Sequence, residues 1–103
     1  MSREIQVLFE IRSALILKDT LKEMGINYEE LGNLITIKKK YHNIVMDLET
    51  GTISFDEMNI NEVNKIKKNY MVNWYKDNAI REGNKVKEEI NEKGQVILHV
   101  YHS

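Results

Sequence analysis

Three histidines are the residues of this chain best suited to bind a metal or carry a proton: His42, His99 and His102. The stretch around His99 and His102 alternates apolar and polar residues, which predicts a β-strand. Successive side chains of a strand point to opposite faces, so two ligands from one strand need a spacing of two, not three. The sequence contains no Cys, which removes thiolate ligands. We therefore expect no metal and no cofactor, with His42 in a turn and the other two histidines on a surface strand.

Acidic residues occur in several pairs, of which Asp47 and Glu49 are the best placed for chemistry. On a strand these two side chains share one face, close enough to hold one divalent ion. Paired acid–base catalysis also needs surroundings that separate the pKa values of the two carboxyl groups, and the neighbouring sequence indicates none. The sequence also lacks a glycine-rich phosphate-binding motif. We expect a solvated face at this pair, no catalytic residue and no enzymatic activity.

The densest basic segment is a predicted turn formed by Lys38, Lys39, Lys40 and Tyr41. Such a turn could contact a phosphate backbone through its lysines and stack Tyr41 on a base. Four acidic residues lie nearby in sequence, at positions 47, 49, 56 and 57, and the whole chain has only three Arg. We expect a solubilising turn, and weak nucleic-acid binding through Lys38–Tyr41 is kept as an alternative.

An aromatic run lies in the segment that predicts the longest helix. Tyr70 and Trp74 are four residues apart and belong to its apolar stripe. Tyr75 lies off that stripe and, with Met71, could form the edge of a protein-binding patch, because aromatic residues and Met are enriched at interfaces. The outer face of the last strand is the second candidate. The expected partner-contact residues are Met71, Tyr75, His99 and Tyr101.

These residues must be positioned by elements that hydrophobic periodicity predicts. We expect two helices: one over residues 13–24, capped by Ser13, and a longer one that Asn59 or Asn61 caps and Gly83 ends. We expect strands at 4–11, 26–31, 34–39 and 44–49, a short return strand from residue 53, and a hairpin over 85–101. In the last strand Val96, Leu98 and Val100 take the buried face. The predicted fold is a single α+β domain over residues 1–103. Its two helices pack on one face of a mainly antiparallel sheet, in a ferredoxin-like β-α-β-β-β-α-β-β order.

Composition limits the possible functions. The 103 residues carry a formal net charge of −1, without the basic excess of a nucleic-acid-binding domain. The absence of Cys fits a reducing compartment, and no stretch approaches the roughly 20 apolar residues of a membrane span. The first residues lack the apolar run of a signal peptide. We expect a cytoplasmic protein. Lys, Asn and Ile, whose codons are rich in A and T, are plentiful, which fits a bacterium or a phage in its host.

Both ends of the chain resemble a known family. The start, MSREIQVLFEIRSALILKDTLKEMGI, is similar to a strand–helix–Gly unit of that family. The second half repeats its order of packing and turn residues: Tyr70, Ala79, Gly83, Val86, Glu88, Glu89, Gly94, Val96, Leu98 and Val100. The chain thus resembles the hypothetical chloroplast reading frame thirty-five family, a bacterial and plastid domain of unknown function, with the middle shortened. The resemblance implies a fold and no mechanism.

Three functions remain open from the sequence. The first is a non-enzymatic accessory module that acts by protein–protein contact, with an N-terminal strand available for edge pairing or for a homodimer. The second is a phage-encoded inhibitor of a host defence enzyme, similar in kind to an anti-CRISPR protein. The third is the weak nucleic-acid binder described above.

Overall fold

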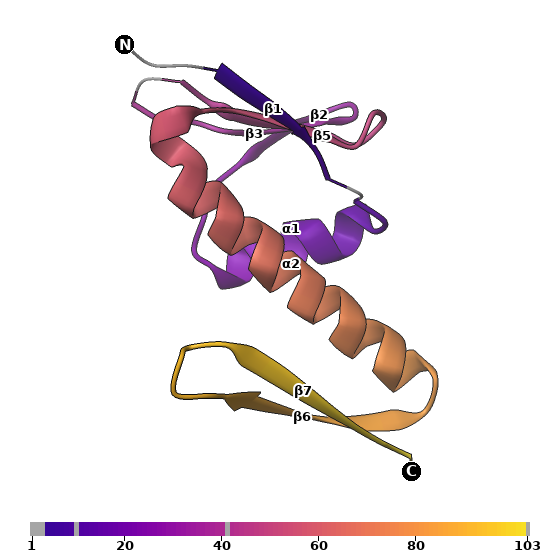
Figure 1. Cartoon of the computed structure of the whole chain (residues 1–103). Helices are drawn as coiled ribbons and strands as arrows, with labels where there is room; N and C mark the ends of the chain where they lie inside the picture. Colours follow the sequence, from indigo (N-terminus) through magenta and orange to yellow (C-terminus); the bar gives the residue numbers. More distant parts are fainter. Residues whose placement is uncertain (1–3, 10, 41, 103) are drawn as a thin grey trace.

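The computed structural model of the chain describes residues 4–9, 11–40 and 42–102. Figure 1 shows two helices between a larger sheet and a separate hairpin. The elements are β1 (Glu4–Leu8), α1 (Ala14–Glu23), β2 (Glu29–Leu31), β3 (Leu34–Ile37), β4 (Ile44–Asp47), β5 (Thr52–Asp56), the short 3-10 helix η1 (Glu57–Asn59), α2 (Ile60–Arg81), β6 (Asn84–Ile90) and β7 (Val96–His102).

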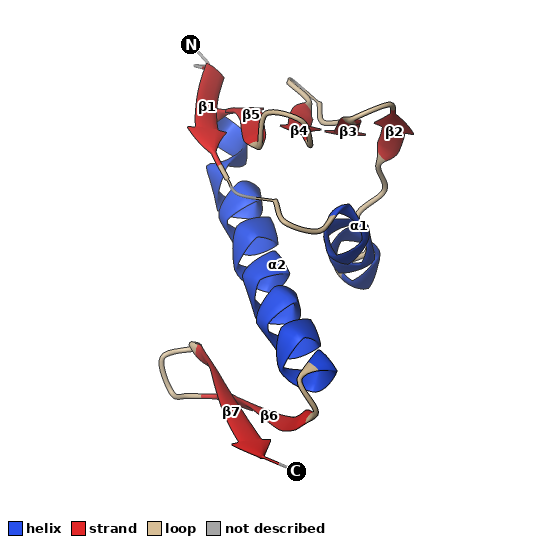
Figure 2. Ribbon diagram, turned by 90° about the vertical axis from the view of Figure 1, so that its right-hand side faces the viewer, coloured by secondary structure: helices blue, strands red, loops and turns tan. Residues whose placement is uncertain are grey.

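The larger sheet has five strands in the order β1-β5-β4-β3-β2, and each neighbouring pair is antiparallel. Strands β2 to β5 form a meander, while β1 lies at the edge beside β5. Figure 2 shows α1 and α2 on the same side of this sheet. The predicted α+β class is therefore confirmed. The four strand segments expected between the helices are all present, one more than the predicted β-α-β-β-β-α-β-β order contains, and the strand order does not confirm the ferredoxin-like arrangement.

The core lies between the sheet and the two helices. Alternate residues of the central strands face the helices, as period-two patterning predicts. The buried apolar side chains are Phe9, Leu17, Leu21, Ile35, Ile37, Ile44, Met46, Ile53, Phe55, Val63, Ile66 and Tyr70. Each large aliphatic or aromatic side chain buried there stabilises the fold by about 1.5–3 kcal/mol relative to exposure.

The segment that leads into α1 is held by α2. The Tyr70 hydroxyl oxygen accepts hydrogen bonds from the backbone N–H groups of Arg12, at 2.7 Å, and Ser13, at 3.1 Å. The Ser13 side chain in turn accepts from the N–H of Ile16, which confirms the predicted N-cap. The first turn of α1 is thus anchored to the middle of α2.

The hairpin of β6 and β7 forms its own sheet, so the prediction of one sheet for all strands is wrong. The 22 residues of α2 span about 33 Å, and its buried residues before Ala79 all lie between Val63 and Tyr70. The C-terminal half therefore extends beyond the core. Gly83, with φ of +83°, reverses the chain, and β6 returns along α2, where Lys76 Nζ lies 2.9 Å from Glu88 Oε2.

This arrangement makes the molecule elongated. The Cα radius of gyration is 15.0 Å, whereas a compact domain of this length has a value of about 13 Å. Figure 2 shows the five-stranded sheet and the hairpin at opposite ends of α2. Neither helix within the described ranges is long and apolar enough to cross a membrane.

Candidate protein-interaction surface

Two adjoining hollows follow the C-terminal half of α2, and Trp74 and Tyr75 line both. We call the two together the aromatic groove. The first hollow, of about 360 Å³, is lined by Phe9, Arg12, Tyr70, Met71, Trp74 and Tyr75. The second, of about 530 Å³, lies between α2 and the hairpin and is lined by Trp74, Tyr75, Asn78, Ala79, Glu82, Asn84, Leu98 and Val100. The groove therefore joins α2 to both the segment before α1 and β7.

The rings in the groove hold one another in fixed orientations. The Trp74 and Tyr75 rings pack edge to face, with centroids 5.2 Å apart and planes at 82°. The Arg12 guanidinium carbon lies 4.8 Å from the centre of the Trp74 ring, a cation–π geometry. Behind them, the rings of Phe9 and Tyr70 meet edge to face at 5.3 Å. A rigid aromatic wall is preorganised for contact, because little side-chain freedom is lost when a partner packs on it.

The groove keeps apolar surface in contact with water. Tyr75 is 54% exposed, as its position off the apolar stripe predicts, and Val100 is 52% exposed. Met71 is also exposed. Val100 lies on the hairpin face that patterning predicts to be buried, but α2 covers only part of that face. An exposed apolar surface of this kind is typical of a contact site.

His99 and Tyr101 lie on the opposite face of the hairpin. Their rings stack with centroids 6.4 Å apart, and His99 Nε2 lies 2.8 Å from Glu89 Oε2. Since side chains alternate along β7, these two point away from the groove, while Leu98 and Val100 line it. The four predicted partner-contact residues therefore divide between two faces: Met71 and Tyr75 in the groove, and His99 and Tyr101 outside it.

The basic turn is largely paired with acidic side chains. Lys38 Nζ lies 3.1 Å from Glu29 Oε1, and Lys39 forms an ion pair with Glu62. Lys40 is exposed and also has an interaction partner, whereas Tyr41 lies outside the described residues. Pairing neutralises much of the positive charge that phosphate recognition needs. The turn is thus a weaker candidate for binding than the groove.

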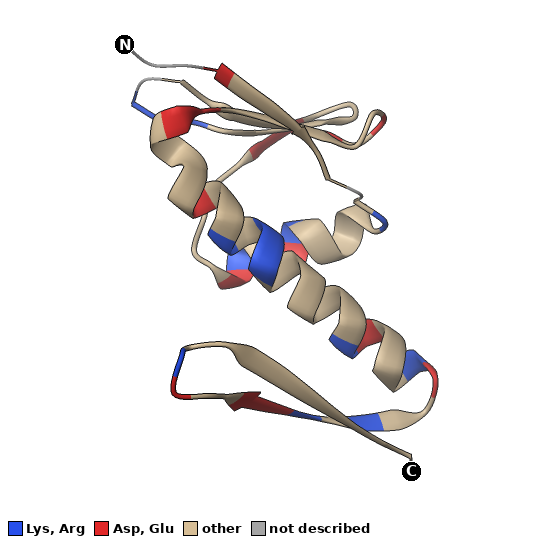
Figure 3. Cartoon of the chain, viewed as in Figure 1, with Lys and Arg blue, Asp and Glu red and all other residues tan. Residues whose placement is uncertain are grey.

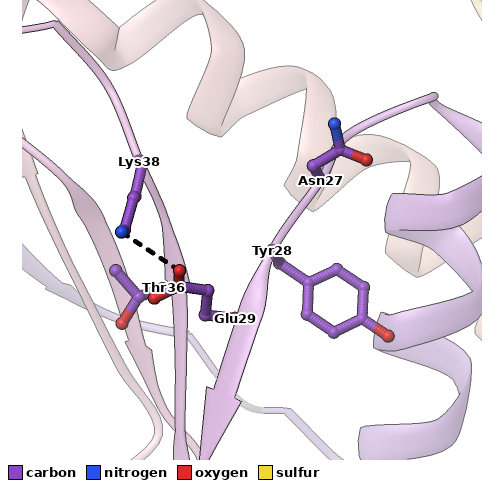
Figure 4. Close-up of a pocket in the computed structure, with 5 residues that line it drawn as sticks. All are labelled: Asn27, Tyr28, Glu29, Thr36 and Lys38. Atoms are coloured by element: carbon purple, nitrogen blue, oxygen red, sulfur yellow. Dashed lines mark ion pairs between the residues drawn. The ribbon is translucent and has the colours of Figure 1, made fainter.

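A shallow hollow beside this turn offers no reactive set of groups. Asn27, Tyr28, Glu29, Thr36 and Lys38 line it. Figure 4 shows the ion pair of Lys38 with Glu29 within the hollow and the Tyr28 ring directed away from both. The pair occupies both charged groups, and exposure to water keeps such a contact weak.

The acidic and histidine candidates serve local structure in this fold. One carboxylate oxygen of Asp47 accepts hydrogen bonds from the backbone N–H groups of Glu49, at 2.9 Å, and Thr50, at 3.2 Å. Asp47 therefore closes the turn between β4 and β5. His42 Nε2 lies 3.9 Å from Asp56 Oδ1. Residues 4–9, 11–40 and 42–102 contain no group of three side chains arranged to hold a metal ion.

The two strands of the hairpin differ in charge. Figure 3 shows Lys and Arg interspersed with Asp and Glu along α2 and β6, while β7 carries neither kind. The sequence of β7, VILHVYH, indeed lacks all four residue types.

Sequence reasoning missed two parts of the groove. Arg12 was not a candidate, because nothing in its local sequence indicates that it reaches Trp74 across 62 positions. Leu98 and Val100 were assigned to a buried strand face, whereas they form the wall of an open hollow. Comparison of the chain with protein-family models, curated proteins and solved structures finds no match. The resemblance to the hypothetical chloroplast reading frame thirty-five family therefore stays a prediction.

Proposed function

We propose that this chain is a non-enzymatic accessory module that acts by protein–protein contact through the aromatic groove. The observation that carries the proposal is the open apolar hollow between α2 and β7, with Tyr75 and Val100 each about half exposed on its walls. Trp, Tyr, Met and Arg are the residues most enriched at protein interfaces, and all four types line the first hollow.

The shape and rim of the groove favour a protein as the ligand. Its apolar floor is bordered by polar side chains, among them Arg12, Asn78 and Glu82. An apolar centre with a polar rim is the usual organisation of a protein interface. Tyr75 is the expected energetic centre, because it borders both hollows and its ring is already oriented by Trp74. Truncation of such a central aromatic residue weakens binding by about 2 kcal/mol, a factor of about 30.

The test is affinity capture from the host lysate with the tagged chain, followed by titration of the captured protein against Tyr75→Ala. A matched control is Leu31→Ala, because Leu31 is 81% exposed at the far edge of the five-stranded sheet. We expect the Tyr75 variant to bind about 30-fold more weakly and the Leu31 variant to bind as the unmodified chain does. Equal binding by both variants, or no captured protein, would contradict the proposal.

A further inference from the structure

Strand β7 has an unprotected edge. Within the described chain its only neighbour in the sheet is β6, so the other edge presents unpaired backbone groups. Natural edge strands are usually protected by charged side chains, above all Lys, because a bare apolar edge pairs with another strand. β6 follows that rule, with Lys85, Lys87, Glu88 and Glu89. β7 breaks it, since none of its seven residues is Asp, Glu, Lys or Arg.

The register identifies which groups point to the free edge. At the hairpin turn the N–H of Asn91 donates to the carbonyl oxygen of Gln95, at 3.0 Å, so this pair is hydrogen bonded. Along the rest of the hairpin, hydrogen-bonded pairs alternate with pairs that are not hydrogen bonded. Ile97, His99 and Tyr101 bond to β6. The intervening residues direct their N–H and C=O groups outward: Val96, Leu98, Val100 and His102.

The hairpin has only part of the support that such a sheet normally needs, because α2 packs along one of its faces and leaves an open hollow beside β7. Two-stranded sheets are at best marginally stable on their own, and a third strand or a packed layer is required. None of the buried core side chains comes from β6 or β7. Val100 and Tyr101 remain about half exposed, on opposite faces of β7. A strand added at the β7 edge would supply backbone partners and cover part of this surface.

We propose that β7 pairs antiparallel with β7 of a second copy of this chain, about a two-fold axis at His99. The inference rests on the proposed function, because it assigns a protein partner to the free edge of the strand that forms one wall of the aromatic groove. In this register the outward residues of the two copies face each other and form about eight backbone hydrogen bonds. The cross-axis side-chain pairs are Ile97 with Tyr101, Leu98 with Val100, and Val96 with His102. Aromatic and aliphatic pairs of this kind stabilise antiparallel sheets.

A second copy fits this edge better than an unrelated strand, because the two β7 strands are complementary to each other and their pairing leaves no free β7 edge. β7 brings no Asp, Glu, Lys or Arg to the axis, where His99 meets His99 of the other copy. The resulting four-stranded sheet has β6 at both outer edges, where Lys85 and Lys87 oppose further growth. Pairing through β6 instead would place Lys87 opposite Lys87 of the other copy, which is unfavourable. A two-fold dimer is also the commonest closed assembly of identical chains.

The aromatic groove lies on the flank of α2 that faces β7, and therefore next to the proposed two-fold axis. Leu98 and Val100 line the groove from β7, whereas Lys76 reaches β6 on the other flank of α2. A continuous antiparallel sheet has its two-fold axis perpendicular to the sheet, so α2 of each copy covers the same face. The two grooves then flank the axis, and the half-exposed Val100 of each copy becomes covered.

The first experiment measures the mass of the full chain by size-exclusion chromatography with light scattering, at about 100 μM. We expect twice the chain mass of 12.2 kDa. Val100→Pro removes an N–H group that points to the free edge of β7 and leaves the hydrogen bonds between β7 and β6 in place. It should raise the dissociation constant of the dimer about 30-fold, from two lost hydrogen bonds per dimer. Val86→Pro is the matched control, since Val86 faces Val100 and its N–H points to the other edge.

The second experiment uses the absence of Cys from the chain. In the proposed register the two His99 residues face each other in a non-hydrogen-bonded pair, with Cα atoms about 4.5 Å apart. His99→Cys should therefore form an intermolecular disulfide on mild oxidation. Lys87→Cys, the direct neighbour on β6, lies at an outer strand of the four-stranded sheet, about 14 Å from its counterpart. It should form none.

The outcomes separate this inference from the proposed function. A dimer that Val100→Pro weakens and Val86→Pro preserves, with cross-linking at position 99 alone, supports the two-fold pairing. A monomeric mass for the unmodified chain, or equal effects of the two proline variants, overturns it. A monomer that still captures another protein in a Tyr75-dependent manner overturns only the pairing. A monomer that captures none overturns both.

Discussion

Replacing Tyr70 with Phe removes one oxygen atom from the core and keeps the ring that packs against Phe9. Tyr70 is 1% exposed, and its hydroxyl oxygen accepts two backbone hydrogen bonds, from Arg12 and Ser13. These two N–H groups lie at the start of α1, where a helix has no internal acceptors for its first donors. The variant therefore leaves both donors without their acceptor, while it changes no apolar packing.

The magnitude follows from the burial of those two donors. A fully buried donor without a partner costs about 1–3 kcal/mol, but the Arg12 side chain is exposed and both hydrogen bonds are only partly buried. We therefore expect the free energy of unfolding to fall by about 2 kcal/mol in total, and the melting temperature to fall by about 10 °C for a chain of this length. The denaturant slope m should not change, because the folded structure buries the same area.

Urea unfolding followed by circular dichroism measures this effect. Tyr75→Phe is the matched control, since it removes the same oxygen from an exposed tyrosine of the same helix and should change stability by less than about 0.5 kcal/mol. If Tyr70→Phe is as stable as the unmodified chain, water replaces the hydroxyl and α2 does not anchor the start of α1. Equal losses in both variants would refute the reasoning in the same way.

Three further stability predictions use the same urea measurement. Met46→Ala, at a fully buried position, should cost about 2–5 kcal/mol through the cavity that it leaves, and a smaller loss would mean that the core collapses around it. Gly51→Ala should cost about 2 kcal/mol, because φ is +71° and the new Cβ would lie 3.3 Å from the Phe9 carbonyl oxygen. Gly94→Ala is the control: its φ is +77°, but no atom lies within 4 Å of the new Cβ, so it should cost about half as much. Ser13→Ala should cost about 1 kcal/mol by removing the cap of α1, and an unchanged midpoint would contradict that role.

Local signals predicted the elements well where neighbouring residues decide the structure. The first helix was expected over 13–24 and is observed as Ala14–Glu23, because Ser13 caps it and Gly25 adopts the positive φ that ends it. The hairpin was expected over 85–101 and is observed over 84–102 with the expected face alternation. Each of these features depends on a few consecutive residues.

Features that depend on distant contacts were predicted less well. Residues 29–31 form only a three-residue strand, which exists through its pairing with β3 rather than through its own pattern. Asp56 ends β5 and caps η1, where its Oδ2 accepts from the N–H of Met58 at 2.8 Å. The prediction placed the cap of the second helix at Asn59 or Asn61; Asn59 has the N-cap position, but its side chain makes no capping bond.

The candidate site was predictable only in part for the same reason. Tyr75 and Met71 could be placed at a helix edge from periodicity, since their positions relative to Tyr70 fix their angle around the helix. Trp74 shares the stripe of Tyr70 but is only partly buried. Periodicity gives the direction of a side chain and does not tell how far along the helix the partner layer extends.

The length of α2 relative to the sheet explains both why the hairpin forms a sheet of its own and where the groove lies. A helix that ended near Tyr70 would cover the core and return its following strands to the sheet. The additional three turns extend beyond the core, with Trp74 at its border, and Gly83 then folds β6 back along α2, away from the five-stranded sheet (Figure 1). The Lys68 Nζ bond to the carbonyl of Gly94, at 3.1 Å, and the Lys76–Glu88 ion pair hold the hairpin there through exposed polar contacts. Such contacts contribute little stability, so a second chain that packs on the apolar surface between α2 and β7, as we propose, would hold the hairpin more firmly than these contacts do.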